Sequence, residues 1–128
     1  MNPVDLKYNK EHEYAKADRK VVTMGITDHA QESLGDVVFV ELPEVGSTVT
    51  AGQSYGTVES VKAVSDVTSS VSGKVVEVNS AVVDSPDLLN SDPYGEGWLI
   101  KVEADDLALL DSMMSAAEYE SFLAEEEH

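Results

Sequence analysis

Residues 57–68 read TVESVKAVSDVT, and this stretch is nearly a mirror image about the bond between Lys62 and Ala63. Valine and threonine favour β-strands because branching at Cβ suits a pleated surface. We therefore predict a β-hairpin with a two-residue loop at Lys62 and Ala63, in which Val61 faces Val64. Such a hairpin would present a single lysine at its tip.

The lysine at this tip is isolated, since Lys62 is the only lysine or arginine between Lys20 and Lys74. In the mirrored pairing, Glu59 and Asp66 face each other across the strands. Like charges placed there are unfavourable by roughly 0.2–1 kcal/mol. Three readings of this pair stay open: the two carboxylates mark the lysine for a modifying enzyme, contact a cargo, or are simply screened by solvent.

The bulk composition limits the class of protein. A chain of 128 residues with 42% hydrophobic residues is expected to form one domain over residues 1–128 with a real core. No apolar run approaches 18 residues and the first residues do not resemble a signal peptide, so we expect a cytoplasmic protein without a membrane span. The absence of cysteine excludes disulfides, thiolate catalysis and a Cys-ligated metal.

The net charge of −17 makes this an acidic protein and argues against a nucleic-acid partner, because phosphate binding needs clustered lysine and arginine. The same charge is compatible with docking onto basic partner surfaces, where electrostatic steering raises the association rate. Solubility, or adaptation to a salty cytoplasm, would explain it equally well.

Short β-rich segments separated by turn residues predict a compact β-sandwich or flattened barrel over about residues 6–102. Residues 36–42 are expected to form a fully buried strand. A short helix is expected over residues 28–34, with Thr27 or Asp28 as its N-cap and Gly35 as its C-cap.

The end of the chain, about residues 105–127, is expected to be helical and to pack on the β-core. Ser115 and Glu118 have the spacing of a capping box that opens the last helix. Tyr119 and Phe122 would share its apolar face. The acidic residues 125–127 oppose the helix dipole, so we expect this end to fray.

Patterns typical of self-sufficient catalytic sites do not occur. The sequence contains neither a glycine-rich phosphate loop nor a Gly-x-Ser-x-Gly turn. His12, His29 and His128 are far apart along the chain, so no metal site is expected. The one remaining feature that could take part in chemistry is Lys62 at the tip of the predicted hairpin. A single lysine displayed in this way points to a non-catalytic carrier.

Several segments, in order, resemble the H protein of the glycine cleavage system, a family of lipoyl carriers. The segment ESVKAVSD at residues 59–66 resembles the family's lipoyl-attachment segment. The resemblance covers nearly the whole chain and extends through residues 10–13 (KEHE), 25–31 (GITDHAQ), 34–46 (LGDVVFVELPEVG), 71–79 (VSGKVVEVN) and 92–98 (DPYGEGW).

This resemblance implies a mainly β fold, a barrel-sandwich hybrid with two similar halves, and a lipoyl group on Lys62. It implies that Glu59, Val61, Ala63 and Asp66 form the site recognised by a lipoyl- or octanoyl-transferring enzyme. The arm would receive an aminomethyl group from a pyridoxal-phosphate glycine decarboxylase and carry it to the tetrahydrofolate-dependent aminomethyltransferase. Dihydrolipoamide dehydrogenase would then reoxidise the arm.

We further expect a carboxylate near the arm to hold the aminomethyl cation. Glu13, beside His12 in the family-like segment, is the first candidate and Asp66 the second. The alternative is that Glu13 is a solvated surface carboxylate. Two departures from the family pattern, Tyr14 in place of tryptophan and Ser70 in place of proline, concern the packing of the cleft and not the lysine turn.

Three other functions remain to be distinguished from glycine cleavage. A biotinyl domain would carry methionines on both sides of its lysine, whereas this chain has Val61 and Ala63. A lipoate-relay protein would pass lipoyl groups to other enzymes. An unmodified interaction domain would use the hairpin only as a scaffold.

Overall fold

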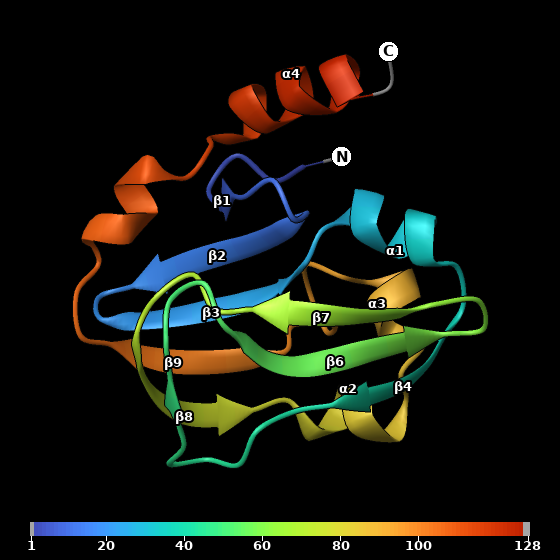
Figure 1. The fold of residues 1–128 in the computed structure, drawn as a ribbon, viewed down its shortest axis with the longest axis horizontal. Helices are drawn as coiled ribbons and strands as arrows, with labels where there is room; N and C mark the ends of the chain where they lie inside the picture. Colours follow the sequence, from blue (N-terminus) through green and yellow to red (C-terminus); the bar gives the residue numbers. More distant parts are fainter. Residues whose placement is uncertain (1, 127–128) are drawn as a thin grey trace.

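Two antiparallel β-sheets and a set of short helices make up the computed structural model, which describes residues 2–126 (Figure 1). The larger sheet has six strands in the order β1-β2-β3-β9-β8-β5, and the smaller has three in the order β4-β6-β7. The strands are β1 (Lys7–Tyr8), β2 (Glu13–Asp18), β3 (Val21–Ile26), β4 (Val37–Glu41), β5 (Thr48–Val49), β6 (Ser54–Ser60), β7 (Val64–Thr68), β8 (Gly73–Val78) and β9 (Ile100–Ala104).

Both sheets contribute to one hydrophobic core. Val22 on β3, Val75 on β8 and Val102 on β9 come from the larger sheet, whereas Val58 on β6 and Val67 on β7 come from the smaller one. These side chains are at most 2% exposed, as expected where alternate residues of each strand face inward. The predicted mainly β sandwich is therefore confirmed.

The helices lie around the sheets and in the C-terminal segment (Figure 1). They are α1 (Asp28–Leu34), α2 (Ser80–Asp84), α3 (Leu88–Ser91), the 3-10 helix η1 (Ala108–Ser112) and α4 (Ala116–Glu126). No helix within residues 2–126 is long and apolar enough to cross a membrane. The short α2 and α3 and the strand β2 were not anticipated from the sequence.

Helix α1 has the predicted bounds. The Thr27 hydroxyl oxygen accepts a hydrogen bond from the Ala30 N–H at 3.2 Å, so Thr27 is the N-cap. Gly35 ends the helix with a φ of 78°, a left-handed value that glycine adopts without a steric penalty.

Strand β4 is only half buried, so the prediction of a fully buried strand was wrong. Val37 and Val40 are 4% and 2% exposed, but Val38 and Phe39 are 52% and 49% exposed. The physical reason is the position of β4 at the edge of the three-stranded sheet, together with an irregular register between Val37 and Phe39. Apolar composition alone does not distinguish such an edge strand from a central one.

The capping box of α4 is confirmed. The Ser115 N–H donates to a Glu118 carboxylate oxygen at 2.8 Å, and the Glu118 N–H donates to the Ser115 hydroxyl at 3.2 Å. The ring of Tyr119 stacks on that of Tyr8 with centroids 4.8 Å apart, which docks α4 onto β1. The expected fraying was wrong at Glu126, because α4 continues to this residue; residue 127 lies outside the described chain.

Candidate functional site

The hairpin formed by β6 and β7 has a different register from the predicted one. Glu59 pairs with Val64 and Thr57 pairs with Asp66, so residues 61–63 connect the two strands and residues 60–63 form a four-residue turn. The two-residue loop and the mirrored pairing were therefore wrong, and Glu59 and Asp66 do not face each other.

The turn chemistry explains this register. Two-residue hairpin loops require positive φ angles, for which glycine and asparagine are suited and Lys62 and Ala63 are not. Ser60 closes the four-residue turn instead: its N–H donates to the Ala63 carbonyl at 2.8 Å. Its hydroxyl oxygen accepts from the N–H groups of Ala63 at 3.1 Å and Lys62 at 3.3 Å.

Lys62 is exposed at this turn. The turn between β6 and β7 lies next to the segment that follows α1 (Figure 1). The Val61 N–H donates to the Asp36 carbonyl at 3.1 Å and so ties the turn to that segment. A methyl group placed on Gly35 would lie 3.8 Å from Lys62 Cε, so the lysine side chain leans over the C-terminal end of α1. Val61 itself is 72% exposed.

A cleft runs beside α1, and we call it the α1 cleft. Its volume of about 170 Å³ is many times the ~10–15 Å³ that one water molecule needs, so it can admit a side arm. Its walls come from the β1–β2 loop, the end of β3, α1, β6 and β7. The lining residues are Glu11, His12, Glu13, Ile26, Ala30, Ser33, Leu34, Val58, Ser65, Asp66 and Val67.

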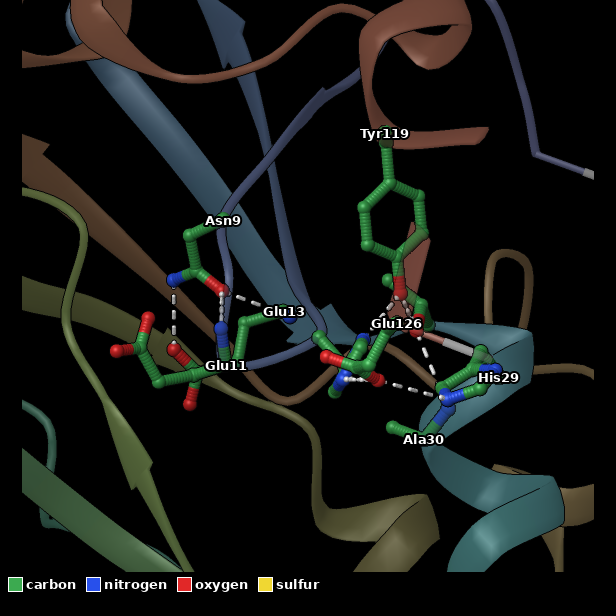
Figure 2. Close-up of polar contacts among 9 residues, drawn as sticks. Asn9, Glu11, Glu13, His29, Ala30, Tyr119 and Glu126 are labelled. Carbon is green, nitrogen blue, oxygen red and sulfur yellow. Dashed lines mark hydrogen bonds and ion pairs between the residues drawn. The ribbon is translucent and has the colours of Figure 1, made fainter. Parts of the chain in front are cut away.

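Glu13 is the buried carboxylate of the α1 cleft, with 4% of its surface exposed. Its Oε2 accepts from the Thr68 N–H at 2.7 Å. Its Oε1 accepts from the Thr68 hydroxyl at 2.7 Å. The same oxygen accepts from the Asn9 amide at 2.9 Å (Figure 2). A carboxylate offers about four acceptor positions, so about one remains for a ligand in the cleft. The alternative of a solvated surface carboxylate is therefore wrong.

Burial raises the pKa of the Glu13 carboxyl, against the opposing effect of hydrogen bonds from Asn9 and Thr68 that favour the charged form. Asp66, by contrast, is exposed on the β7 wall of the cleft. Glu59 is half-buried and does not line the α1 cleft. Of the residues predicted for the site, the structure thus brings Glu13, His12 and Asp66 into one cleft.

His12 joins the α1 cleft to helix α4. Its Nδ1 lies 2.8 Å from the Tyr119 hydroxyl, and its Nε2 lies 3.1 Å from a carboxylate oxygen of Glu126 (Figure 2). Burial lowers the pKa of the His12 imidazole, and the nearby Glu126 carboxylate opposes that shift.

His12 lies beside His29, although the two are far apart along the chain. The two rings lie 4.4 Å apart between centroids. They meet because the Thr27 N–H donates to the His12 carbonyl at 3.0 Å, which places the start of α1 beside the β1–β2 loop. No spacing of histidines along the chain could have revealed this tertiary contact.

The sequence and the fold are similar to those of known proteins. Residues 6–126 match the family described as "Glycine cleavage H-protein". A glycine cleavage system H protein of Carboxydothermus hydrogenoformans is 58% identical over 97% of this chain and 95% of that protein. The mitochondrial glycine cleavage system H protein 2 of Arabidopsis thaliana is 55% identical over 96% of this chain and 79% of that protein.

A solved structure agrees with these relatives. The crystal structure of a glycine cleavage system H protein from Mycobacterium marinum superposes with a TM-score of 0.89 at 43% identity, covering 96% of this chain and 99% of that one. Sequence identity above one half over nearly the full length, together with this superposition, decides the assignment. This chain belongs to the glycine cleavage H-protein family, whose members are lipoyl carriers and not themselves catalytic.

Proposed function

We propose that this chain is the lipoyl carrier of the glycine cleavage system and that Lys62 is the point of covalent attachment. The observation that carries this proposal is the placement of Lys62. Its amine is exposed on a closed turn, and its side chain leans over Gly35, next to Leu34 in the wall of the α1 cleft. An arm extended from Lys62 can therefore follow α1 into the cleft.

The turn suits a modifying enzyme. It is held by Ser60 and presents Lys62 between two exposed small apolar residues, Val61 and Ala63. Glu59 and Asp66 lie on the two strands that lead into it. We propose that a lipoyl- or octanoyl-transferring enzyme recognises this shape and these two carboxylates as a unit, although they do not face each other.

When attached, the lipoyl disulfide would supply the acceptor for the aminomethyl group released by the glycine decarboxylase, and the other enzymes of the system would unload and reoxidise it. The chain itself contains no cysteine. Hence no thiolate of the protein can attack the arm and exchange with it.

Glu13 would hold the loaded arm. The aminomethyl group is cationic, and the Glu13 carboxylate, which lines the cleft, has about one acceptor position that Asn9 and Thr68 do not use. A charge-assisted hydrogen bond is stronger in a buried site than in water because the local dielectric constant is lower. Asp66 would add a second, weaker attraction because it is exposed. His12 would contribute the face of its ring, since both of its nitrogens have partners.

The test is the reconstituted reaction. Lipoylated chain, glycine decarboxylase and glycine should yield an aminomethyl adduct on Lys62, seen by intact mass. In the Glu13→Gln variant the adduct should hydrolyse about tenfold faster or more, because a hydrogen bond to a charged group contributes about 1.5–3 kcal/mol. The Asp66→Asn variant should show a smaller effect.

Two outcomes would contradict these proposals. An unchanged hydrolysis rate in the Glu13→Gln variant would remove Glu13 from the mechanism. A chain that becomes lipoylated at Lys62 yet forms no adduct with the decarboxylase would instead be a lipoate-relay protein.

A further inference from the structure

Two histidines and a carboxylate converge at the junction of three elements. His12 comes from the β1–β2 loop, His29 from the first turn of α1 and Glu126 from the end of α4 (Figure 2). One oxygen of Glu126 lies 3.1 Å from His12 Nε2 and 3.8 Å from His29 Nε2. One ligand atom from each of these three residues lies within 4.8 Å of the others.

The backbone holds His12 in an unusual conformation. Its φ of 64° is left-handed, which is uncommon for a residue other than glycine. The Asn9 side-chain oxygen accepts from the N–H groups of Glu11 and Glu13, both at 3.0 Å, and so fixes the loop on either side of His12. Conformations of this kind persist where the surroundings enforce them, and they concentrate at ligand sites.

His12 Nδ1, the ring nitrogen that does not face Glu126, has a hydrogen-bonding partner. Histidines that bind a metal through one nitrogen usually have such a partner at the other. The Tyr119 hydroxyl lies 2.8 Å from His12 Nδ1 and 2.8 Å from the Thr27 hydroxyl. When Tyr119 donates to Thr27 and accepts from His12 Nδ1–H, the lone pair of His12 Nε2 is free to coordinate.

We propose that His12, His29 and Glu126 form a binding site for a late first-row divalent cation of the Zn²⁺ type. Two imidazoles and a carboxylate are ligands that Zn²⁺ prefers, and three protein ligands leave a fourth position for water or another ligand. Magnesium and calcium, which prefer all-oxygen ligands, should bind poorly here.

The side chains of the three proposed ligands need to move only a little to coordinate Zn²⁺. Ligand atoms around tetrahedral Zn²⁺ stand about 3.3–3.4 Å apart, as follows from Zn–N distances of about 2.0–2.1 Å. The Glu126 oxygen lies 3.1 Å from His12 Nε2, slightly closer than that separation, and the Glu126 side chain is 42% exposed at the end of a helix. His29 has a side chain 26% exposed, and a rotation of its ring would bring its Nε2 closer.

The site would connect two parts of the molecule. His12 lines the α1 cleft, whereas Glu126 belongs to α4, so a bound ion would fasten the end of α4 to the rim of the cleft. This inference goes beyond the carrier function and does not depend on the lipoyl assignment, because none of its three ligands is the attachment residue.

The test is a titration of the full-length chain with Zn²⁺ alone, by calorimetry and by thermal unfolding. The chain is kept free of the lipoyl group, because its dithiol form would itself bind Zn²⁺. We expect one ion per chain, and a Tm that rises with the Zn²⁺ concentration. Substituting Co²⁺ should give the visible absorption of a four-coordinate site.

Single-ligand variants should weaken binding. His29→Gln and Glu126→Gln should each lower the Zn²⁺ affinity at least about tenfold, and Tyr119→Phe should lower it about 10- to 100-fold as an outer partner. Glu120→Gln is the matched control, since it removes the same charge from an exposed position of α4. A His128→Ala variant, which removes the third histidine of the sequence, should bind as the parent does.

Three results would overturn the proposal. The first is Zn²⁺ binding in Glu126→Gln or His29→Gln as tight as in the parent. The second is an equal loss in Glu120→Gln or His128→Ala, which would assign binding to the general acidity of the chain or to another residue. The third is displacement of Zn²⁺ by excess Mg²⁺, which would show that the site lacks the preference for Zn²⁺ over Mg²⁺ that imidazole ligands confer.

Discussion

Lys62 projects from a turn made by consecutive residues, whereas Glu13 and His12, in the wall of the α1 cleft, are held by groups from distant parts of the chain. The turn is closed by Ser60 and tied to Asp36 through the Val61 N–H, and Lys62 is exposed. Glu13 is buried and bound by Asn9 and Thr68. The proposed attachment residue, Lys62, can therefore be replaced without disturbing the fold, whereas Glu13 is part of the fold.

The largest effect on stability should follow from Glu13→Ala. Removing this carboxylate leaves the Thr68 N–H, the Thr68 hydroxyl and the Asn9 amide without their acceptor in a buried place. We expect the free energy of unfolding to fall by about 3 kcal/mol. Urea unfolding measures this loss.

The matched control at the same cleft is Asp66→Asn. Because Asp66 is exposed, its replacement should change stability by less than about 0.5 kcal/mol. Equal losses of unfolding free energy in the Glu13→Ala and Asp66→Asn variants would contradict the distinction between a buried and an exposed carboxylate.

A smaller loss is expected for Ser60→Ala in the turn. The substitution removes the hydroxyl that accepts from the N–H groups of Lys62 and Ala63, and it should cost about 1 kcal/mol. The hairpin register should persist, because β6 and β7 still pair along their length. Cross-strand NMR contacts between Glu59 and Val64 would check this, and contacts between Glu59 and Asp66 would contradict the four-residue turn.

A small gain is expected for Ser70→Ala, just beyond the Thr68 that holds Glu13. The Ser70 hydroxyl is buried and has no hydrogen-bond partner among residues 2–126. Its removal should stabilise the protein by about 1 kcal/mol, because a buried unsatisfied polar group carries an uncompensated desolvation penalty. Thermal unfolding measures the gain, and a lower Tm would show that the hydroxyl has a partner such as water.

Local features of the fold followed from the sequence, and features made by tertiary contacts did not. The bounds of α1 and the capping box of α4 depend on side chains within four residues of each other. The exposure of Phe39 depends on which strand lies at the sheet edge, and the hairpin register depends on the φ angles that Lys62 and Ala63 can adopt.

The same distinction applies to the candidate site. Lys62 was identified because its mirrored flanks are contiguous in sequence, even though the predicted register was wrong. The burial of Glu13 comes from Thr68, 55 residues away, and was not foreseeable from spacing. The meeting of His12 with Glu126 likewise requires α4 to dock on β1 through the stacking of tyrosine rings.

The central claim, that Lys62 is the attachment point, is tested most directly by intact mass and peptide mapping of the chain after lipoyl transfer. We expect one lipoyl group, located on Lys62, and none on the Lys62→Gln variant. That variant should retain the parent's free energy of unfolding within about 0.5 kcal/mol, because the lysine is exposed. A lipoyl group on Lys74 or another lysine, or equal modification of a folded Lys62→Gln variant, would contradict the account.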